Sequence, residues 1–298
     1  MNEHLPQPEN APRKMPARLA AVDSAAQLLG DDTPSVVAAA REFLLSAGAA
    51  GREALQRASE TGDAATRMRA RAMLRGFEVE QWLQRFASLD LADAGWRSSE
   101  PLLAGAVFAS HMVRTFAPDA NELRQKLWRE AEVLRARFDG RSLNLCARML
   151  SEHLNESLGY RGGEASKLDL EHVLLDRVVD NRIGVPVTLS MIYLLVARWA
   201  GLTVSGVGMP THFLVRLHGV RPVLVDPYYG GRTVTKADCI RHLKSLGYDQ
   251  VLEHMRDLSD REVLAHYLRA LQQAAGHRGR HDAKRSLGEA LSQLGANG

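Results

Sequence analysis

Cysteine is scarce in this sequence. Cys146 and Cys239 are the only two in 298 residues, which is too few for a disulfide framework or for a cysteine-based zinc site. Such a chain suits a reducing compartment, so we expect a cytoplasmic protein. Nothing in the sequence points to a metal or to another cofactor, and we expect neither.

Long apolar runs are also missing. The longest extends from Val185 to Ala197 and is followed by Arg198, so it is too short to span a bilayer and predicts a buried helix. Residues 1–16 are polar, contain several prolines and lack the apolar core of a signal peptide. We expect a disordered tail at residues 1–16 and a soluble protein without a membrane partner.

Neither sign of charge dominates. The 38 basic and 35 acidic residues leave a net charge of +3, and no nucleic-acid-binding motif is present. This balance argues against a dedicated nucleic-acid binder. The length suffices for one large domain or for a core domain with helical additions.

Residues 17–140 are expected to form a helical region. Ala, Leu, Arg and Glu dominate there, and apolar residues recur at intervals of three and four, as at Val36, Val37 and Ala40. The rhythm of short helices resembles HEAT-like hairpins, and a small helical bundle is an equally good interpretation.

Residues 141–247 predict a core that mixes helices with strands. A helix that opens at Pro186, where a first-turn proline is tolerated, is apolar on almost all sides and should be buried at the centre. Three strands are predicted after it, at Thr203–Val207, His212–Leu217 and Pro222–Asp226. Residues 248–298 are expected to form a C-terminal helical hairpin with a faint tetratricopeptide-like character.

The second and third predicted strands place a histidine beside an aspartate. If their hairpin is centred on Gly219, His212 and Asp226 face each other across the antiparallel pair, with Cβ atoms on the order of 5 Å apart. A one-residue slip would separate them. An imidazole beside a carboxylate is the arrangement of a general base, although a buried pair of this kind can also be structural. A helix N-terminus facing such a pair is the expected place for an activated thiolate.

Three segments follow one another in this part of the chain with a distinctive content of glycine, proline and aromatic residues. They are DRVVDNRIGVPVTLS at 176–190, GVGMPTHFLVR at 206–216 and VLVDPYYGG at 223–231. In order and spacing they resemble the Gly-Ile-Pro motif, the Gly-x-Gly-x-Pro-x-His-Phe-Leu segment and the Asp-Pro-aromatic-x-Gly-Gly segment of the SirB family, which belongs to the transglutaminase-like superfamily.

This resemblance implies an α+β fold with a transglutaminase-like core, in which a central buried helix packs on a small antiparallel sheet. An all-helical N-terminal region precedes the core and a short helical C-terminus follows it. Active superfamily members carry a cysteine at the start of the central helix and a histidine and an aspartate on adjacent strands. His212 and Asp226 match the latter two, and the cysteine position falls on Pro186, as in the SirB family itself.

The resemblance also outlines a binding cleft. Its expected positions are Gly184, Pro186, Thr188, Thr211 and Tyr228. Thr211 departs from the glycine that is common in the family. Because proline has no nucleophilic atom, the acyl-enzyme route is closed. The resemblance therefore implies a pseudoenzyme, with His212 and Asp226 as a vestigial dyad, that binds a protein or peptide partner.

Two other functions stay open at this point. The first is a cysteine-independent hydrolase or transferase that uses His212 and Asp226 on amide or ester bonds. In it, water or one of three side chains, Thr188, Ser190 or Cys146, would act as nucleophile, although such groups are more often structural. The second is a metal site, for which the pair supplies two ligands and no motif supplies a third. The sequence gives no prediction of the oligomeric state.

Overall fold

The computed structural model describes residues 17–91, 99–114, 118–163, 168–210 and 212–295. The tail expected at residues 1–16 and the cleft position Thr211 lie outside the described residues. The chain divides into two compact units, Met1–Glu80 and Gln81–Gly298. The division falls inside the region predicted as helical, because the helices of residues 100–138 pack on the core that follows them.

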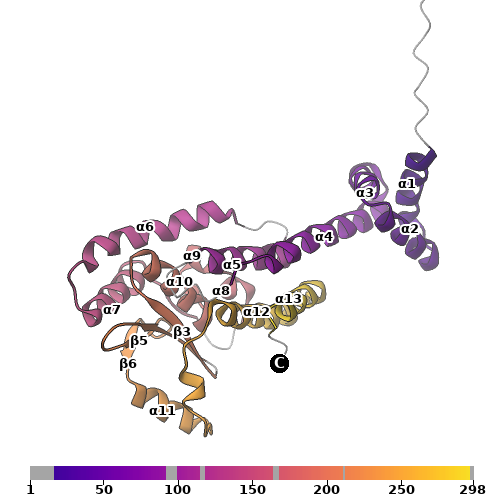
Figure 1. Cartoon of the computed structure of the whole chain (residues 1–298). Coiled ribbons are helices and arrows are strands. Elements are labelled where there is room, and N and C mark those ends of the chain that lie inside the picture. Colours follow the sequence, from indigo (N-terminus) through magenta and orange to yellow (C-terminus); the bar gives the residue numbers. More distant parts are fainter. Residues whose placement is uncertain (1–16, 92–98, 115–117, 164–167, 211, 296–298) are drawn as a thin grey trace, which may run out of the picture. The chain divides into compact units, whose positions relative to one another are not determined.

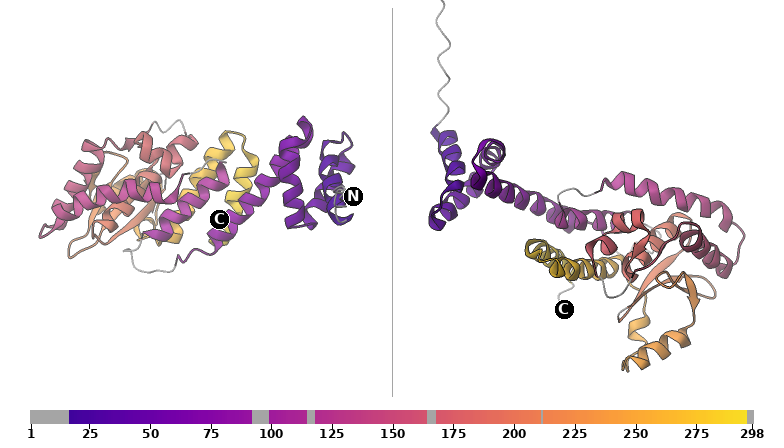
Figure 2. Two further views of the ribbon diagram at one scale, coloured as in Figure 1. Left: turned by 90° about the horizontal axis from the view of Figure 1, so that it is seen from above. Right: turned by 180° about the vertical axis from the view of Figure 1, so that it is seen from behind.

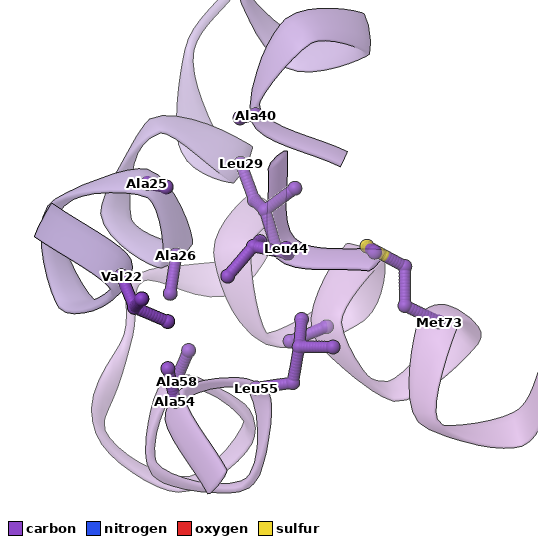
Figure 3. Close-up of a cluster of buried hydrophobic side chains, with 11 residues drawn as sticks. Val22, Ala25, Ala26, Leu29, Ala40, Leu44, Ala54, Leu55, Ala58 and Met73 are labelled. Carbon is purple, nitrogen blue, oxygen red and sulfur yellow. The ribbon is translucent and has the colours of Figure 1, made fainter. Parts of the chain in front are cut away.

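The N-terminal unit consists of helices around a small apolar cluster. Its elements are α1 (Ala17–Gln27), η1 (Leu28–Gly30), α2 (Pro34–Ser46), α3 (Ala49–Thr61) and the first part of α4 (Ala64–Ala87). Leu29, Leu44 and Leu55 are fully buried in the cluster. Figure 3 shows these leucines between alanines of neighbouring helices, whose small side chains allow close packing. The HEAT-like arrangement stays a prediction.

The second unit is α+β, as predicted. Its helices before the sheet are α5 (Glu100–Val113), α6 (Ala120–Phe138), α7 (Leu143–Ser151), the π-helical turn η3 (Glu152–Ser157), α8 (Leu170–Val173), α9 (Leu175–Asn181) and α10 (Pro186–Trp199). The sheet is followed by α11 (Lys236–Ser245), η4 (Glu253–Met255), α12 (Asp260–His277) and α13 (His281–Gln293).

The sheet is small and antiparallel. Its four strands are β3 (Val204–Met209), β4 (His212–Leu217), β5 (Val223–Asp226) and β6 (Arg232–Val234), in that spatial order. The three strands expected from the sequence are present, and β6 is an addition. Two further short strands, β1 (Arg161–Gly162) and β2 (Ile183–Gly184), form a separate parallel pair. The pair brings Gly184, which lies two residues before the start of α10, beside Gly162.

Helix α10 is the buried centre of the unit. Every residue from Val187 to Trp199 is buried, which agrees with the apolar character that the sequence shows on all sides of this helix. It packs on β3 and β4, while α11 contributes Cys239 and Leu243 to an apolar cluster with Val207 and Leu214. Figure 1 shows α10 and α11 on opposite sides of the strands.

The C-terminal helices extend this core. Helices α12 and α13 pack against each other and both contact α5, so the three lie side by side (Figure 2). Helix α12 also contacts α8, α10 and β3. A buried ion pair links it to the central helix, since the two terminal guanidinium nitrogens of Arg198 each lie 2.8 Å from a carboxylate oxygen of Asp260. None of the helices that the structure describes is long and apolar enough to cross a membrane.

The helical segment that precedes β2 is divided in two, α8 and α9. Leu174 has an extended conformation, with ψ at 122°, and separates α8 from α9. The Tyr267 hydroxyl accepts the N–H of Leu175 at 3.1 Å, so the break is satisfied by α12. This contact is long-range, and the local apolar pattern does not reveal it.

Candidate functional site

The hairpin of β4 and β5 brings His212 and Asp226 together in a register that differs from the predicted one. Val215 pairs with Val225 and Leu217 with Val223, which is a shift of two residues from a hairpin centred on Gly219. The prediction was wrong because Pro222 has no N–H to donate to the ladder, so β5 begins one residue later. Side chains alternate with period two, so the shift leaves both residues on the same face.

The two side chains are in close contact. Nε2 of His212 lies 3.0 Å from Oδ1 of Asp226. Asp226 is 2% exposed, and its carboxylate also accepts the N–H of Tyr229 at 3.2 Å and lies 3.6 Å from Nε of Arg232. The ring N–H of His212 is not directed at the carboxylate, and Nε2 makes no hydrogen bond among the described residues. The contact is therefore an electrostatic approach without an aligned hydrogen bond.

The turn that follows Asp226 is held in place by the π-helical segment η3. The amide of Asn155 donates to the carbonyls of Tyr160 and Pro227, and its oxygen accepts the hydroxyl of Tyr193. At the end of the turn Gly231 has φ +68°, and a Cβ there would lie 2.4 Å from the Tyr193 hydroxyl. Only glycine fits that position. This network sets the direction of Tyr228 and Tyr229.

Both tyrosines stand beside the histidine. The ring centroids of Tyr228 and Tyr229 lie 6.0 and 5.5 Å from that of His212. The Tyr228 hydroxyl donates to the carbonyl of Gly163, and a Cβ on Gly162 would lie 2.6 Å from the Tyr228 ring. Glycine at β1 is thus needed for the close approach of this ring. Burial raises the pKa of the Tyr228 hydroxyl, so the group stays protonated and remains a donor.

These groups border a cavity of about 560 Å³, which we call the main cavity. Pro186 lines it at the start of α10, together with Gly184, Val185 and Val187. The remaining described lining residues come from the segment after β1, from α8 and the residues before it, from β3 and β4, from the turn after β5 and from α12: Gly163, Leu168, His172, Met209, His212, Phe213, Tyr228, Tyr229, His266, Arg269, Ala270 and Gln273. No serine, threonine, cysteine or acidic residue is among the described residues of this lining.

A smaller cavity of about 220 Å³ lies next to it. His212, Met209 and Tyr229 line both cavities, whereas Asp226 and Cys239 line only the smaller one. The imidazole thus borders both cavities, and the carboxylate borders only the smaller one. Burial, with a smaller effect of the Asp238 carboxylate, raises the pKa of the Cys239 thiol, so this cysteine is not an activated nucleophile.

The three candidate nucleophiles from the sequence are occupied elsewhere. Thr188 is fully buried and its hydroxyl donates to the carbonyl of Val173 at 2.8 Å. Ser190 is also fully buried and donates to the carbonyl of Phe213 at 3.2 Å. Cys146 lies 3.9 Å from the carbonyl of Phe138, and burial raises the pKa of its thiol. None of the three lines the main cavity as described.

The structure brings together most, but not all, of the predicted cleft positions. Gly184, Pro186 and Tyr228 line the main cavity with His212, and Thr188 does not. The wall formed by His172 of α8 and by His266, Arg269 and Gln273 of α12 was not predicted from the sequence. The spacing of three and four between the α12 residues marks a shared helix face, but nothing local connects that face with the cleft.

The polar groups do not form a metal site within the described residues. His212 and Asp226 supply two ligands, and the part of the chain that the structure describes holds no group of three His, Cys, Asp or Glu side chains placed to bind an ion. The arrangement can therefore orient an imidazole and hold a ligand against aromatic rings, while serine, threonine, cysteine and acidic residues are missing from the described lining of the main cavity.

Comparison with known proteins gives a consistent result. A family model described as the transglutaminase-like superfamily matches residues 121–269. A UPF0162 protein of Xylella fastidiosa is 36% identical over 116 residues, which are 38% of this chain and 41% of the relative. A UPF0162 protein of Vibrio cholerae is 31% identical over 74 residues, 24% of this chain and 27% of the relative.

Other relatives match at lower identity. F-box only protein 21 of Mus musculus is 26% identical over 95 residues, which are 29% of this chain and 15% of that protein. The matched segments thus span less than half the length of these curated relatives. No solved structure matches the chain.

Proposed function

Because this chain belongs to the transglutaminase-like superfamily, we propose that its main cavity is a superfamily cleft that binds a protein or peptide segment without cleaving it. One observation carries the proposal. Pro186 opens α10 in the lining that also contains His212, and the described lining offers no serine, threonine or cysteine in its place. The domain then acts as a binding or scaffold module.

Proline at this position removes two functional groups at once. It has no thiol, so it cannot form an acyl-enzyme, and it has no backbone N–H to stabilise an oxyanion. The ordered motifs support assignment to the SirB type, whose members carry proline here. In this proposal the position of the cysteine in active superfamily members corresponds to Pro186, and His212 and Asp226 remain as a structural pair.

The cavity itself supports a role in binding. Its volume of about 560 Å³ lies in the range of ligand pockets. Aromatic rings of Tyr228, Tyr229 and Phe213 provide apolar contact area, while histidine and arginine side chains supply a few polar groups. A scaffold with no use for the cleft would be expected to fill it with side chains, whereas the described residues leave a cavity there. We further propose a cytoplasmic location, which the two free thiols support.

The test is a selection of peptides whose binding to the protein requires the main cavity. Random octapeptide libraries, displayed with a free C-terminus or at an internal position, are panned on the full chain. Binding is then compared with Ala270→Trp, which fills the main cavity from α12, and with Ala237→Trp, an exposed control on α11. Gln273→Trp serves as a second filling variant if Ala270→Trp does not fold. Thermal melting checks folding.

We expect peptides that bind the wild type and Ala237→Trp but not the filled variants. The proposal is contradicted if no peptide shows this dependence, or if the wild type hydrolyses amide or ester probes.

A further inference from the structure

A further cavity lies at the end of the sheet where β6 stops. The ladder between β5 and β6 ends at the pair of Leu224 and Val234, whereas the ladder between β4 and β5 continues to Val223. At Thr235, whose side chain caps α11, the chain leaves the sheet, and Figure 1 shows it continue into this helix. On its side away from β4, Val223 therefore has no strand beside it among the described residues. A cavity of about 750 Å³ lies there, which we call the edge cavity.

The floor of the edge cavity is apolar. Leu224, Val234 and Met255 line it and belong to the apolar cluster that α11 and η4 form with the sheet. The other lining residues come from α7, from the strands β4 to β6 and the residues next to them, and from the segment before η4: Asn144, Arg216, Pro222, Val223, Thr233, Thr235, Lys236 and Leu252. All of them lie in stretches that the structure describes without a gap.

Large apolar side chains at the rim of the edge cavity are exposed. Leu252, in the lining, is 60% exposed. Val220 is fully exposed in the turn before β5, two residues from the lining residue Pro222. Exposed apolar side chains gathered beside a cavity are typical of a surface that another molecule covers. A small ligand inside the cavity would leave Val220 in water, whereas a segment of another protein can cover both side chains.

The cations of the lining differ in their pairing. Arg216 forms an ion pair with Asp257 at 2.5 Å, and its other terminal nitrogen donates to the carbonyl of Met255 at 2.7 Å, so its charge is already compensated. Lys236 is exposed and forms no ion pair with any residue that the structure describes. The same holds for Arg221 in the turn before β5, within the described part of the chain.

Acidic residues occur near the edge cavity but not in its lining. Asp238 pairs with Arg241 and takes part in the cap of α11. Asp249 and Glu253 are exposed on the segment that carries Leu252. No aspartate or glutamate is among the described lining residues. The uncompensated charge in the lining is therefore that of Lys236.

We propose that the edge cavity docks a segment of a partner protein that carries a large apolar side chain beside an aspartate or glutamate. The apolar side chain enters the cavity over Leu224 and Met255 and covers Leu252, while the carboxylate pairs with Lys236. The edge cavity shares no described lining residue with the main cavity, so the inference does not rest on the proposed function. A second copy of this chain is a poorer occupant, because a two-fold interface would bring the same cations, Lys236 and Arg221, together.

The experiment begins with random octapeptides displayed at an internal position and panned on the full chain. Peptides are kept if they bind the wild type but not Asn144→Trp, which fills the edge cavity from α7. Gln125→Trp, exposed on α6 and outside the lining, is the matched control. Thr233→Trp is the second filling variant if Asn144→Trp does not fold, and thermal melting checks folding.

Calorimetry with synthetic copies of the selected peptides then tests the charge. Lys236→Gln removes one exposed ion pair, so we expect it to weaken binding by about two- to fivefold. Lys244→Gln, exposed on the same helix and outside the lining, should leave binding unchanged. Replacing the aspartate or glutamate of the peptide by its amide should weaken binding to the wild type equally, and should have no further effect on Lys236→Gln.

The apolar contact has its own variant. Leu252→Ala should weaken the selected peptides by about fivefold, because it removes part of the apolar surface that the peptide covers. Leu45→Ala, which truncates a leucine that is 54% exposed on α2, should leave binding unchanged.

Three results would overturn the inference. In the first, no peptide depends on the edge cavity. In the second, the selected peptides bind Lys236→Gln as tightly as the wild type and are indifferent to neutralisation, which removes the acidic partner. In the third, sedimentation shows dimers of the wild type that Asn144→Trp abolishes, which assigns this face to a second copy. None of these results bears on peptide binding by the main cavity.

Discussion

Oδ1 of Asp226 lies 3.0 Å from Nε2 of His212, although the two residues are not partners in the ladder between β4 and β5. They are diagonal neighbours on one face, at a separation that side chains of this length can bridge. The carboxylate also accepts a hydrogen bond from the backbone N–H of Tyr229. The pair therefore links the sheet to the turn that carries both tyrosines.

If His212 and Asp226 form a structural pair, their interaction should contribute to the free energy of unfolding. Asp226→Ala leaves the Tyr229 N–H without its acceptor, so we expect a loss of about 1–3 kcal/mol in the free energy of unfolding. His212→Ala should cost less, and the double variant should reveal a coupling of at least about 0.5 kcal/mol. Urea unfolding of the three variants measures this. Strictly additive losses would contradict a structural pairing.

A thiol placed at the start of α10 should become reactive. Pro186→Cys puts it at a helix N-terminus in the cavity lining shared with His212, where the helix dipole lowers a thiol pKa. We expect faster alkylation by iodoacetamide near pH 7 than for Ala237→Cys, an exposed control. Adding His212→Ala should slow it.

Peptide mapping separates this labelling from that of Cys146 and Cys239, whose thiol pKa values are raised by burial. If Pro186→Cys reacts no faster than the control, the start of α10 is not an activated position, and the superfamily comparison at this residue is wrong.

The ion pair between Arg198 and Asp260 should matter for stability. The Arg198 side chain is 0% exposed and its pairing with Asp260 is bidentate. Replacing one partner leaves a buried charge, so Asp260→Asn or Arg198→Met should cost about 3–5 kcal/mol. Arg285→Met removes a comparable pair with Asp282 on the surface and should change stability by less than about 1 kcal/mol. Chemical denaturation compares the three, and equal losses would contradict this account.

Glu262 at the start of α12 should contribute to acid sensitivity. Its hydrogen bond from Arg256 lowers the pKa of this carboxyl from 4.5 to about 2. A lowered pKa in the folded state stabilises the protein above the unfolded value, and this stabilisation is lost as the pH falls from about 4.5 to about 2. The side chain is 34% exposed, so screening reduces the effect to on the order of 1 kcal/mol.

Denaturation of Glu262→Gln at about pH 6 and about pH 3 should show a smaller loss on acidification than the wild type. Glu289→Gln, exposed on α13, should lose as much stability as the wild type. An unchanged loss in Glu262→Gln would show that its ion pair does not form.

The sequence predicted the parts of the fold that depend on local pattern. The apolar run from Val185 to Ala197 predicted a buried helix, and in the structure every residue from Val187 to Trp199 is buried. The three longer strands were found from their branched residues. The short strands β1, β2 and β6 were not, because two or three residues carry no periodicity.

Of the candidate site, the side formed by β4 and β5 was predictable from the sequence, and the side formed by α12 was not. His212 and Asp226 lie close in sequence and on a hairpin, so local geometry and the resemblance both indicated them. His266 and Arg269 reach the same cavity through the packing of α12 on β3 and α8. That contact depends on small residues such as Gly208, where a Cβ would collide with His266, and no local pattern in either segment encodes it.

Turnover of chromogenic amide and ester substrates tests most directly whether the cleft binds without catalysis. The wild type and His212→Ala are assayed side by side, with folding checked by thermal melting. We expect the wild type to show no turnover above that of His212→Ala, because Pro186 supplies neither thiol nor N–H. Turnover by the wild type that disappears in folded His212→Ala would contradict the account and identify an enzyme.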